Sequence, residues 1–391
     1  MANPHKIPFV GKYKKSMDSI KREDEQGLLY QMTYSADYYK LLPLFTKKAG
    51  AGCSTFFKKN MEGEALMARN FDFRHYRNAD DSSIDNLTSL AVLVRCENPR
   101  AKYRSIGLAD AYFLDYKGGH FSAGVLDDGK TDISLGLVLP FLCMDGVNEQ
   151  GLAVSIMMLP TKCRWEETEY REFESLTEAE KKKAKLLTVP GEVPDGDEPR
   201  IQADALALNT ADRKAWKANK KFAVNQNRKG RKTVMHTVLM RMMLDSCATV
   251  EEAIRLAESV NIKSAIAESD FHVMVADTSG RSVMLEWTEE QMIYADLSHG
   301  TNYYGVREDH YGYGQERDDI MAAAVRYYQN GMPEKTAMRM LGVVSQDIRD
   351  GSGPSFTQWS AVYNLAQKSL KLCMQMDYDR VFEYRLTEEK E

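Results

Sequence analysis

The sequence predicts an α+β protein, built as a layered sandwich of sheets and helices. Apolar runs with strand character come first, helical segments follow, and further strands surround a last helix. Strands and helices do not alternate regularly, which argues against a βαβ fold. Hydrophobic residues make up 43% of the 391 residues and charged residues 28%, so the chain can bury a sizeable core in one large or two ordinary domains.

The first 52 residues differ in composition from the rest of the chain. They begin polar and basic, become rich in tyrosine from Tyr30 to Phe45, and end in the small-residue run Ala49-Gly50-Ala51-Gly52. We interpret residues 1–52 as an N-terminal prosegment or a retained extension of a domain that spans residues 53–391. Tyrosines and leucines need cover, so the segment from Tyr30 to Phe45 is expected to pack against that domain.

A β-hairpin is predicted directly after the glycine-rich break. Cys53 to Lys58 and Glu64 to Asn70 are apolar-rich runs on either side of Asn60-Met61-Glu62-Gly63, a turn signal. Similar runs predict eight further strands: Leu90–Arg95, Gly136–Leu142, Leu152–Leu159, Phe271–Ala276, Arg281–Trp287, Gln291–Ala295, Gln358–Leu365 and Ser369–Met376. Helices are predicted at Thr177–Leu187, His236–Cys247, Val250–Val260 and Asp319–Gln329, the first and third with capping boxes at their start.

Residues 165–233 interrupt this pattern. They are highly charged and contain a cluster of proline and glycine from Pro190 to Pro199. This composition is typical of a solvated insertion, and we expect the segment to be dispensable for the core fold.

Charge and cysteine content exclude several functions. The formal net charge is -5 and the pI about 5.9, so no basic field favours nucleic acid or an anionic membrane. The six cysteines form no Cys-x-x-Cys pair and the histidines no His-x-x-x-His pair, which predicts reduced thiols and neither metal nor cofactor. No apolar run has the length of a membrane span or a signal peptide, so a cytoplasmic protein is expected.

The hairpin gathers groups that carry chemistry. If it turns at Met61 and Glu62, opposed residues have numbers that sum to about 123, so Cys53 faces Asn70 and has Arg69 and Asp72 beside it. A guanidinium favours the nucleophilic thiolate, and a carboxylate can hold a protonated amine. The ordinary alternatives are a cysteine that only fills the core and a surface ion pair of Arg69 with Asp72.

Three segments carry a resemblance to a known family: Gly52-Cys53-Ser54-Thr55-Phe56, Ala68-Arg69-Asn70-Phe71-Asp72-Phe73 and Asp145-Gly146-Val147-Asn148-Glu149-Gln150-Gly151-Leu152. From Cys53 to about Leu386 the chain resembles the choloylglycine hydrolase family, which includes bile salt hydrolases, penicillin V acylases, acid ceramidase and N-acylethanolamine amidases. The resemblance implies a four-layer αββα sandwich of the N-terminal-nucleophile type, with two antiparallel sheets between helical layers.

The resemblance also implies roles for particular residues. Cys53, freed as an N-terminal residue, would attack a linear amide with its own α-amine as general base, since the pKa of such an amine lies near working pH. Arg69 would lie against the thiolate, and Asp72 would accept a hydrogen bond from the cysteine amine. Asn302, which could also be an ordinary turn residue, and the backbone N–H of Met158 would stabilise the oxyanion. Arg317 corresponds to a family arginine near the start of the late helix, although a solvated arginine is an equal alternative.

The expected substrate is a small N-acyl amide with an apolar acyl part. Bile salt hydrolases usually carry asparagine where this chain has Met158, which argues against bile salt specificity. The alternatives are an acyltransferase of the same family, a papain-like protease, for which no matching motifs are present, and an unprocessed scaffold that only binds ligand. Relatives are often oligomers, so a homo-oligomer is a further expectation. Among the histidines, His272 is expected in the core, while His75 and His299 are candidates to line the pocket.

Overall fold

The structure is a computed structural model of the chain. It describes residues 10–44, 52–73, 90–114, 133–160, 170–172, 200–202, 224–264, 269–308, 310–349 and 355–386. The predicted helix at 177–187, His75 and Cys163 lie outside these residues. No helix in the described part of the chain is both long and apolar enough to cross a membrane.

Nine strands form the larger sheet, in the order β1-β2-β5-β6-β7-β8-β13-β14-β15. Their bounds are β1 Lys21–Arg22, β2 Leu29–Tyr34, β5 Ala91–Cys96, β6 Ser105–Asp110, β7 Cys143–Asn148, β8 Ala153–Pro160, β13 Ser269–Ala276, β14 Ser282–Trp287 and β15 Met292–Ala295. Neighbouring strands are antiparallel except β2 and β5, which run parallel. The expected all-antiparallel sheet is therefore wrong at one pair, because the N-terminal segment adds its strand in the same direction as β5.

Six antiparallel strands form the second sheet, in the order β16-β3-β4-β19-β20-β21. Their bounds are β16 His299–Gly300, β3 Gly52–Lys59, β4 Ala65–Asp72, β19 Thr357–Asn364, β20 Ser369–Met374 and β21 Val381–Arg385. The predicted hairpin after Gly52 is the pair β3–β4 at the heart of this sheet.

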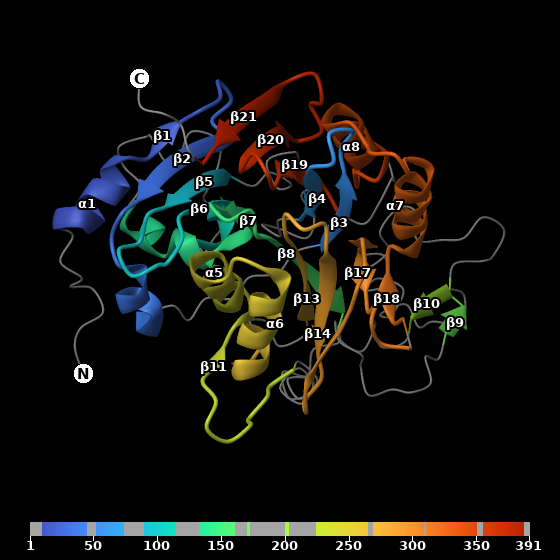
Figure 1. Cartoon of the computed structure of the whole chain (residues 1–391), viewed down its shortest axis with the longest axis horizontal. Coiled ribbons are helices and arrows are strands. Elements are labelled where there is room, and N and C mark those ends of the chain that lie inside the picture. Colours follow the sequence, from blue (N-terminus) through green and yellow to red (C-terminus); the bar gives the residue numbers. More distant parts are fainter. Residues whose placement is uncertain are drawn as a thin grey trace.

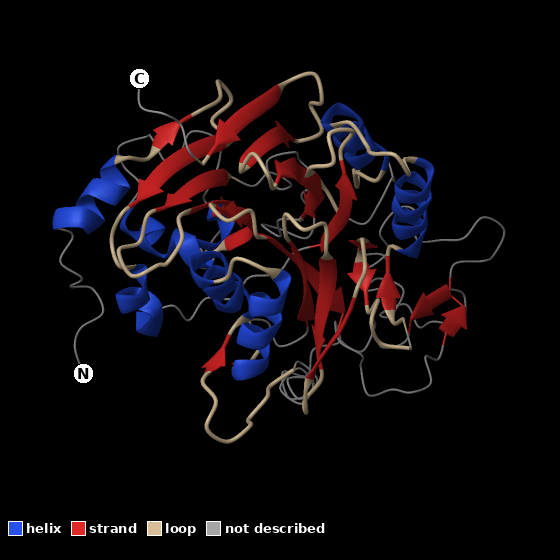
Figure 2. Ribbon diagram, in the orientation of Figure 1, coloured by secondary structure: helices blue, strands red, loops and turns tan. Residues whose placement is uncertain are grey.

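The two sheets lie face to face between two helical layers. Strands β3 and β8 pack across the interface, where Thr55 Oγ1 and Ser155 Oγ are 2.9 Å apart. Helices α5 (His236–Ser246) and α6 (Val250–Ser259) cover the larger sheet, and α7 (Gln315–Tyr327) and α8 (Glu334–Val343) cover the smaller one (Figure 1). Figure 2 shows these helices outside the strands. The predicted α+β fold with αββα layers is confirmed.

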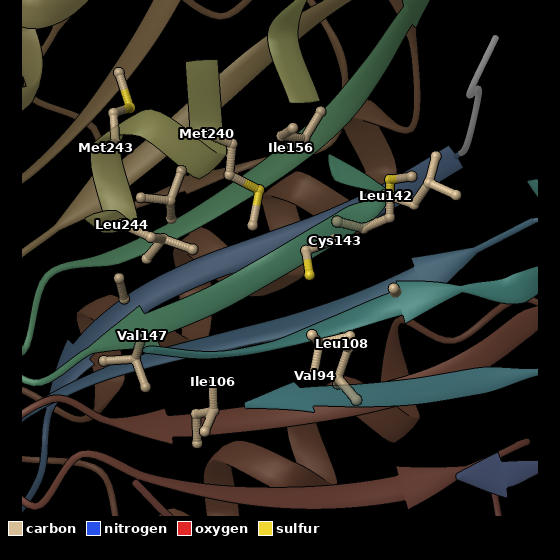
Figure 3. Close-up of a cluster of buried hydrophobic side chains, with 14 of the residues drawn as sticks. Val94, Ile106, Leu108, Leu142, Cys143, Val147, Ile156, Met240, Met243 and Leu244 are labelled. Carbon is tan, nitrogen blue, oxygen red and sulfur yellow. The ribbon is translucent and has the colours of Figure 1, made fainter. Parts of the chain in front are cut away.

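Helix α5 owes its place to its apolar face. Met240, Met243 and Leu244 project from the helix onto the outer face of the larger sheet, where Ile156 also lies (Figure 3). All four side chains are buried, and each such burial contributes about 2 kcal/mol. The methionine-rich stretch of α5 is thus a core face.

Helix α6 begins as its capping box predicts. The Thr249 hydroxyl accepts a hydrogen bond from the Glu252 N–H at 3.2 Å, and the Glu252 carboxylate accepts one from the Ala248 N–H at 2.6 Å. These bonds satisfy two N–H groups that helix formation leaves without partners.

The N-terminal segment is part of the core, as expected. Helix α1 (Gly11–Asp18) and the 3₁₀ helix η1 (Tyr38–Leu44) flank β1 and β2. Tyr30, Tyr34 and Tyr38 are fully buried. The hydroxyls of Tyr38 and Tyr39 donate to Asp245 of α5 at 2.6–2.8 Å, which ties the segment to that helix.

Several element predictions are wrong. The apolar run Gly136–Leu142 falls mostly in a 3₁₀ helix, η5 (Ile133–Phe141), and the strand β7 follows it. A short, wholly apolar run suits a buried helix as well as a buried strand, so periodicity cannot separate them. Helix α7 begins at Gln315, four residues before the predicted start.

The insertion ends earlier than its composition indicates. Most of 165–233 lies outside the described residues, apart from a ribbon of β9 (Tyr170–Glu172) and β10 (Arg200–Gln202). Val224 and Gln226 are buried, however, and β11 (Thr233–Val234) pairs with β12 (Asn261–Ile262). Residues 224–233 therefore belong to the folded protein, anchored by buried Val224 and Gln226, although most of residues 227–233 are exposed.

Candidate active site

Strands β3 and β4 carry the central residues, with a register one residue away from the prediction. Cys53 opposes Phe71 rather than Asn70, because five residues (60–64) link the strands and Gly63 takes a positive φ of 81°. Arg69 therefore lies on the inner face together with Cys53. Asp72 lies on the outer face, toward α7 and α8, so the hairpin alone does not place it beside the thiol.

Arg69 links the thiol to the larger sheet. Its Nη2 donates to Cys53 Sγ at 2.7 Å and to the Ile156 carbonyl at 2.9 Å, while Nη1 donates to Asp145 Oδ2 at 2.5 Å. The Trp359 indole, at 3.2 Å, and the Tyr363 hydroxyl also donate to Asp145. Cys53, Arg69 and Asp145 are all buried, so these charge-assisted contacts are little screened.

Two opposing effects set the acidity of the thiol. Burial raises the pKa of Cys53 to about 11 from an ordinary 9.0, and Arg69 opposes that rise. Burial lowers the pKa of Arg69, but Cys53 and Asp145 outweigh it, and the net pKa is raised. The net result is a raised thiol pKa, because burial outweighs the effect of the guanidinium.

Asp72 and Arg317 form a second buried pair on the outer face. Arg317 Nη1 donates to Asp72 Oδ2 at 3.2 Å and to Ser54 Oγ at 2.6 Å. Thr357 Oγ1 and Gln346 Nε2 each donate to Asp72 at 2.6 Å. Burial raises the pKa of Asp72, and Arg317 opposes that rise. Arg317 is thus an inward side chain and not a solvated one.

Asn302 stands between the two pairs. Its Oδ1 accepts from the Cys53 N–H at 3.2 Å and from Arg317 Nη2 at 3.0 Å, and its Nδ2 donates to the Met158 carbonyl at 2.9 Å. The residues predicted from separate segments therefore meet in one place. The Cys53 nitrogen, here a peptide amide, bonds to Asn302 rather than to Asp72.

A glycine lets Arg317 reach this place. Gly314 has a φ of 90° at the start of α7, and a Cβ there would lie 2.4 Å from an Arg317 guanidinium nitrogen. Any side chain would be strained by the backbone and would displace the arginine. Thr301 Oγ1 donates to the Gly314 carbonyl at 2.9 Å, which ties the start of α7 to the segment next to Asn302.

Among the described residues, no histidine forms a hydrogen bond with the Cys53 thiol. His272 is buried, as expected, and its Nε2 contacts the Thr301 carbonyl at 2.7 Å. His299 Nδ1 contacts Asp318 Oδ1 at 2.8 Å, with His299 paired through β16 to Phe56, whose side chain is on the outer face. In the described part of the chain, no cluster of histidine, cysteine or carboxylate side chains could hold a metal ion.

Sequence reasoning missed several partners of these residues. Asp145 stood in a quoted motif, but only as the start of a turn, and nothing in the spacing links it to Arg69. Gln346 and Thr357 lie more than 270 residues from Asp72 and carry no motif. A buried carboxylate needs hydrogen-bond donors. The sequence could therefore indicate that Asp72 has donors, but not which residues they are.

Residues 216–303 match the model of the family described as linear amide C-N hydrolases, choloylglycine hydrolase family. The resemblance to this family is confirmed. The match supports amide hydrolysis in general terms. A search of curated proteins finds no match.

Three solved structures are similar to the chain over most of its length. Two variants of the conjugated bile acid hydrolase of Clostridium perfringens are 11% identical to it, with TM-scores of 0.44 and 0.45. In each case the similarity covers 85% of this chain and 92% of the other. Penicillin V acylase of Agrobacterium tumefaciens is 14% identical, covers 86% and 89%, and has a TM-score of 0.39.

Proposed function

We propose that the chain is a member of the choloylglycine hydrolase family that cleaves a linear C–N amide bond through a thioester on Cys53. The observation that carries this proposal is the 2.7 Å contact between Arg69 and the Cys53 sulfur, beside the Asn302 amide. A thiol needs such a cation to become a nucleophile at neutral pH. The proposed substrate is a small N-acyl amide with an apolar acyl part.

The proposed base is the α-amine of Cys53, released by cleavage of the Gly52–Cys53 bond. An amide nitrogen cannot accept the thiol proton, whereas an α-amine has a pKa near 8. In the attack, the Cys53 sulfur bonds to the acyl carbon and its proton passes to the amine. The amine then returns the proton to the leaving nitrogen, and water splits the thioester.

Asn302 and the Met158 backbone are the proposed oxyanion donors. Asn302 Nδ2 now donates to the Met158 carbonyl, so it must exchange that acceptor for the substrate oxygen. Arg317 Nη2 donates to Asn302 Oδ1 at 3.0 Å, and Asp72 is the proposed acceptor for the released amine. The cytoplasmic location and the homo-oligomer remain predictions.

A specific observation favours a second candidate, an unprocessed ligand-binding scaffold. With Gly52 attached, Cys53 is buried and burial raises the pKa of its thiol to about 11. Its backbone N–H donates a hydrogen bond to Asn302 Oδ1. In that form the chain lacks both a thiolate and a base, so the uncleaved protein should be inactive.

A panel of N-acyl amides with graded acyl chains, read by mass spectrometry, tests the proposal. Purified protein of known intact mass should release the acyl product, and Cys53→Ala should release none. Adding a free amine distinguishes an acyltransferase from a hydrolase. An acyltransferase would transfer the acyl group to the amine, whereas a hydrolase would release it as free acid. Turnover by Cys53→Ala, or by protein that is wholly uncleaved, would contradict the mechanism.

A further inference from the structure

A buried histidine–glutamate pair lies beside Asn302 and has no part in the chemistry described above. His272 on β13 and Glu286 on β14 are fully excluded from solvent, and His272 Nδ1 is 3.4 Å from Glu286 Oε1. Such a pair is costly to bury, because an apolar pair would fill the space without loss of hydration. Both side chains form hydrogen bonds with the backbone on either side of Asn302.

Glu286 holds the backbone just after Asn302 through hydrogen bonds. Its carboxylate accepts hydrogen bonds from three consecutive backbone N–H groups, those of Gly305, Val306 and Arg307, at 2.7, 3.1 and 3.2 Å. These donors compensate the buried charge. They also fix the loop that follows β17 (Asn302–Tyr303).

His272 holds the backbone just before Asn302 through a hydrogen bond. Its Nε2 lies 2.7 Å from the Thr301 carbonyl, the group in direct peptide linkage with Asn302. A carbonyl can only accept, so His272 donates there. The same residue, Thr301, is held from its side chain by the Gly314 carbonyl at 2.9 Å.

We propose that His272, together with Glu286, is a positioning residue that sets the Thr301–Asn302 peptide and so aims the Asn302 amide at Cys53 and Met158. This inference rests on the proposed function of Asn302. The hydrogen bonds from His272 and to Glu286 leave the backbone between Thr301 and Gly305 little freedom to rotate. An oxyanion donor must keep its place within a fraction of an ångström to be effective.

Four variants test this inference: His272→Phe and His272→Gln, each in the wild-type and the Asn302→Ala backgrounds. His272→Phe removes the donor and should lower kcat by about 10-fold or more with KM changed less than about 2-fold. His272→Gln keeps an N–H donor and should recover most of the loss. In the Asn302→Ala background His272→Phe should have almost no further effect, because the group that it positions is gone.

His236→Phe is the matched control. His236 is also buried beside the larger sheet and packs on Phe271 and Trp287, and within the described residues neither of its ring nitrogens has a hydrogen-bond partner. Its replacement should leave kcat unchanged. Equal losses from His272→Phe in both backgrounds, or from the Gln and Phe variants alike, would overturn the inference and leave His272 a structural residue.

Failure of the proposed function can be told apart from failure of this inference. An inactive wild type on the whole amide panel rejects the function. Deuterium exchange of the peptide that spans Asn302 and Tyr303 then tests the positioning itself. His272→Phe should exchange faster there than wild type and His272→Gln, and equal exchange in all three would reject the inference.

Discussion

Arg69 donates to the sulfur of Cys53 at 2.7 Å while its other terminal nitrogen donates to Asp145 at 2.5 Å. The guanidinium is thus shared between two partners. Its positive charge lowers the pKa of the thiol, and the carboxylate of Asp145 neutralises part of that charge. Burial raises the pKa of Cys53 to about 11 against the pull of Arg69. The balance between the two partners of Arg69 should therefore set the reactivity of the thiol.

Two substitutions should move that reactivity in opposite directions. Arg69→Met removes the cation, raises the thiol pKa further and should slow alkylation of Cys53 by iodoacetamide at pH 8 by roughly 10-fold per unit of pKa change. Asp145→Asn frees the charge of Arg69 for the thiol, lowers its pKa and should speed alkylation. Below pH 11 the wild-type rate should rise about 10-fold per pH unit, as the thiolate fraction does.

Mass spectrometry of the Cys53 peptide gives these rates separately from those of other thiols. Cys96 is an internal control, since it is buried, has a pKa raised to about 11 by burial, and contacts Arg241 at 3.2 Å. Its rate should not change in either variant. Changes of the same sign at Cys53 in both variants would show that Asp145 does not compete for Arg69.

Cys53→Ser should abolish amide hydrolysis and leave the fold intact. A hydroxyl has a far higher pKa than a thiol, so it gives too little nucleophile, yet it can still accept the Arg69 hydrogen bond. Turnover and thermal unfolding measured on the same preparation check both halves. Unchanged turnover in a folded variant would remove Cys53 from the mechanism.

Asn302→Ala should lower kcat by about 100- to 1000-fold if the side chain stabilises the oxyanion. The KM should change less, because the oxyanion forms only in the transition state. Steady-state kinetics on the best substrate of the panel separates the two constants. A rise in KM with kcat intact would assign Asn302 to substrate binding instead.

Hydrogen bonds link Cys53, Arg69, Asp72, Asn302, Met158 and Arg317 into one region, although their catalytic roles stay a prediction. The hairpin pattern singled out the first three residues, and the family resemblance singled out the other three. The hairpin register was wrong by one residue, since periodicity does not reveal whether four or five residues form a turn. That single residue decides which face Asp72 occupies.

Long-range polar partners were not predictable in the same way. Asp145, Gln346 and Glu286 complete buried networks through contacts that depend on tertiary packing, and a single sequence carries no record of such pairing. The run at 136–142 was assigned wrongly because a wholly apolar run has no periodicity that separates a buried 3₁₀ helix from a buried strand. Residues 224–233 were assigned to the insertion because most of them are polar and exposed, although Val224 and Gln226 are buried.

The charged insertion should be removable in part. Arg200 and Glu172 are cross-strand partners in the β9–β10 ribbon, so a two-residue Asn-Gly turn can replace residues 173–199. We expect a soluble protein with unchanged thermal stability and an altered range of amide substrates. A matched deletion that continues through residue 233 removes buried Val224 and Gln226 and should not fold. Loss of folded protein in the shorter deletion alone would place residues 173–199 in the core.

The N-terminal segment should remain bound after cleavage at Gly52–Cys53. Strand β2 pairs along its whole length with β5, and buried Tyr38 donates to Asp245 inside the catalytic domain. Its removal would open the edge of the larger sheet and leave cavities where three tyrosines pack, each worth several kcal/mol. Active protein should therefore contain two chains under native mass spectrometry and two shorter masses under denaturing conditions.

Separate expression makes the test sharper. Residues 53–391 preceded by a methionine, which the cell removes to expose the Cys53 amine, should be insoluble when made alone. The same chain made together with residues 1–52 should be soluble, should co-purify with it and should hydrolyse the panel. Tyr38→Ala in the short chain is the control, because it removes the anchor to Asp245 and should weaken the pairing. If residues 53–391 were soluble and active alone, the segment would be a true prosegment and the buried tyrosines would serve folding only.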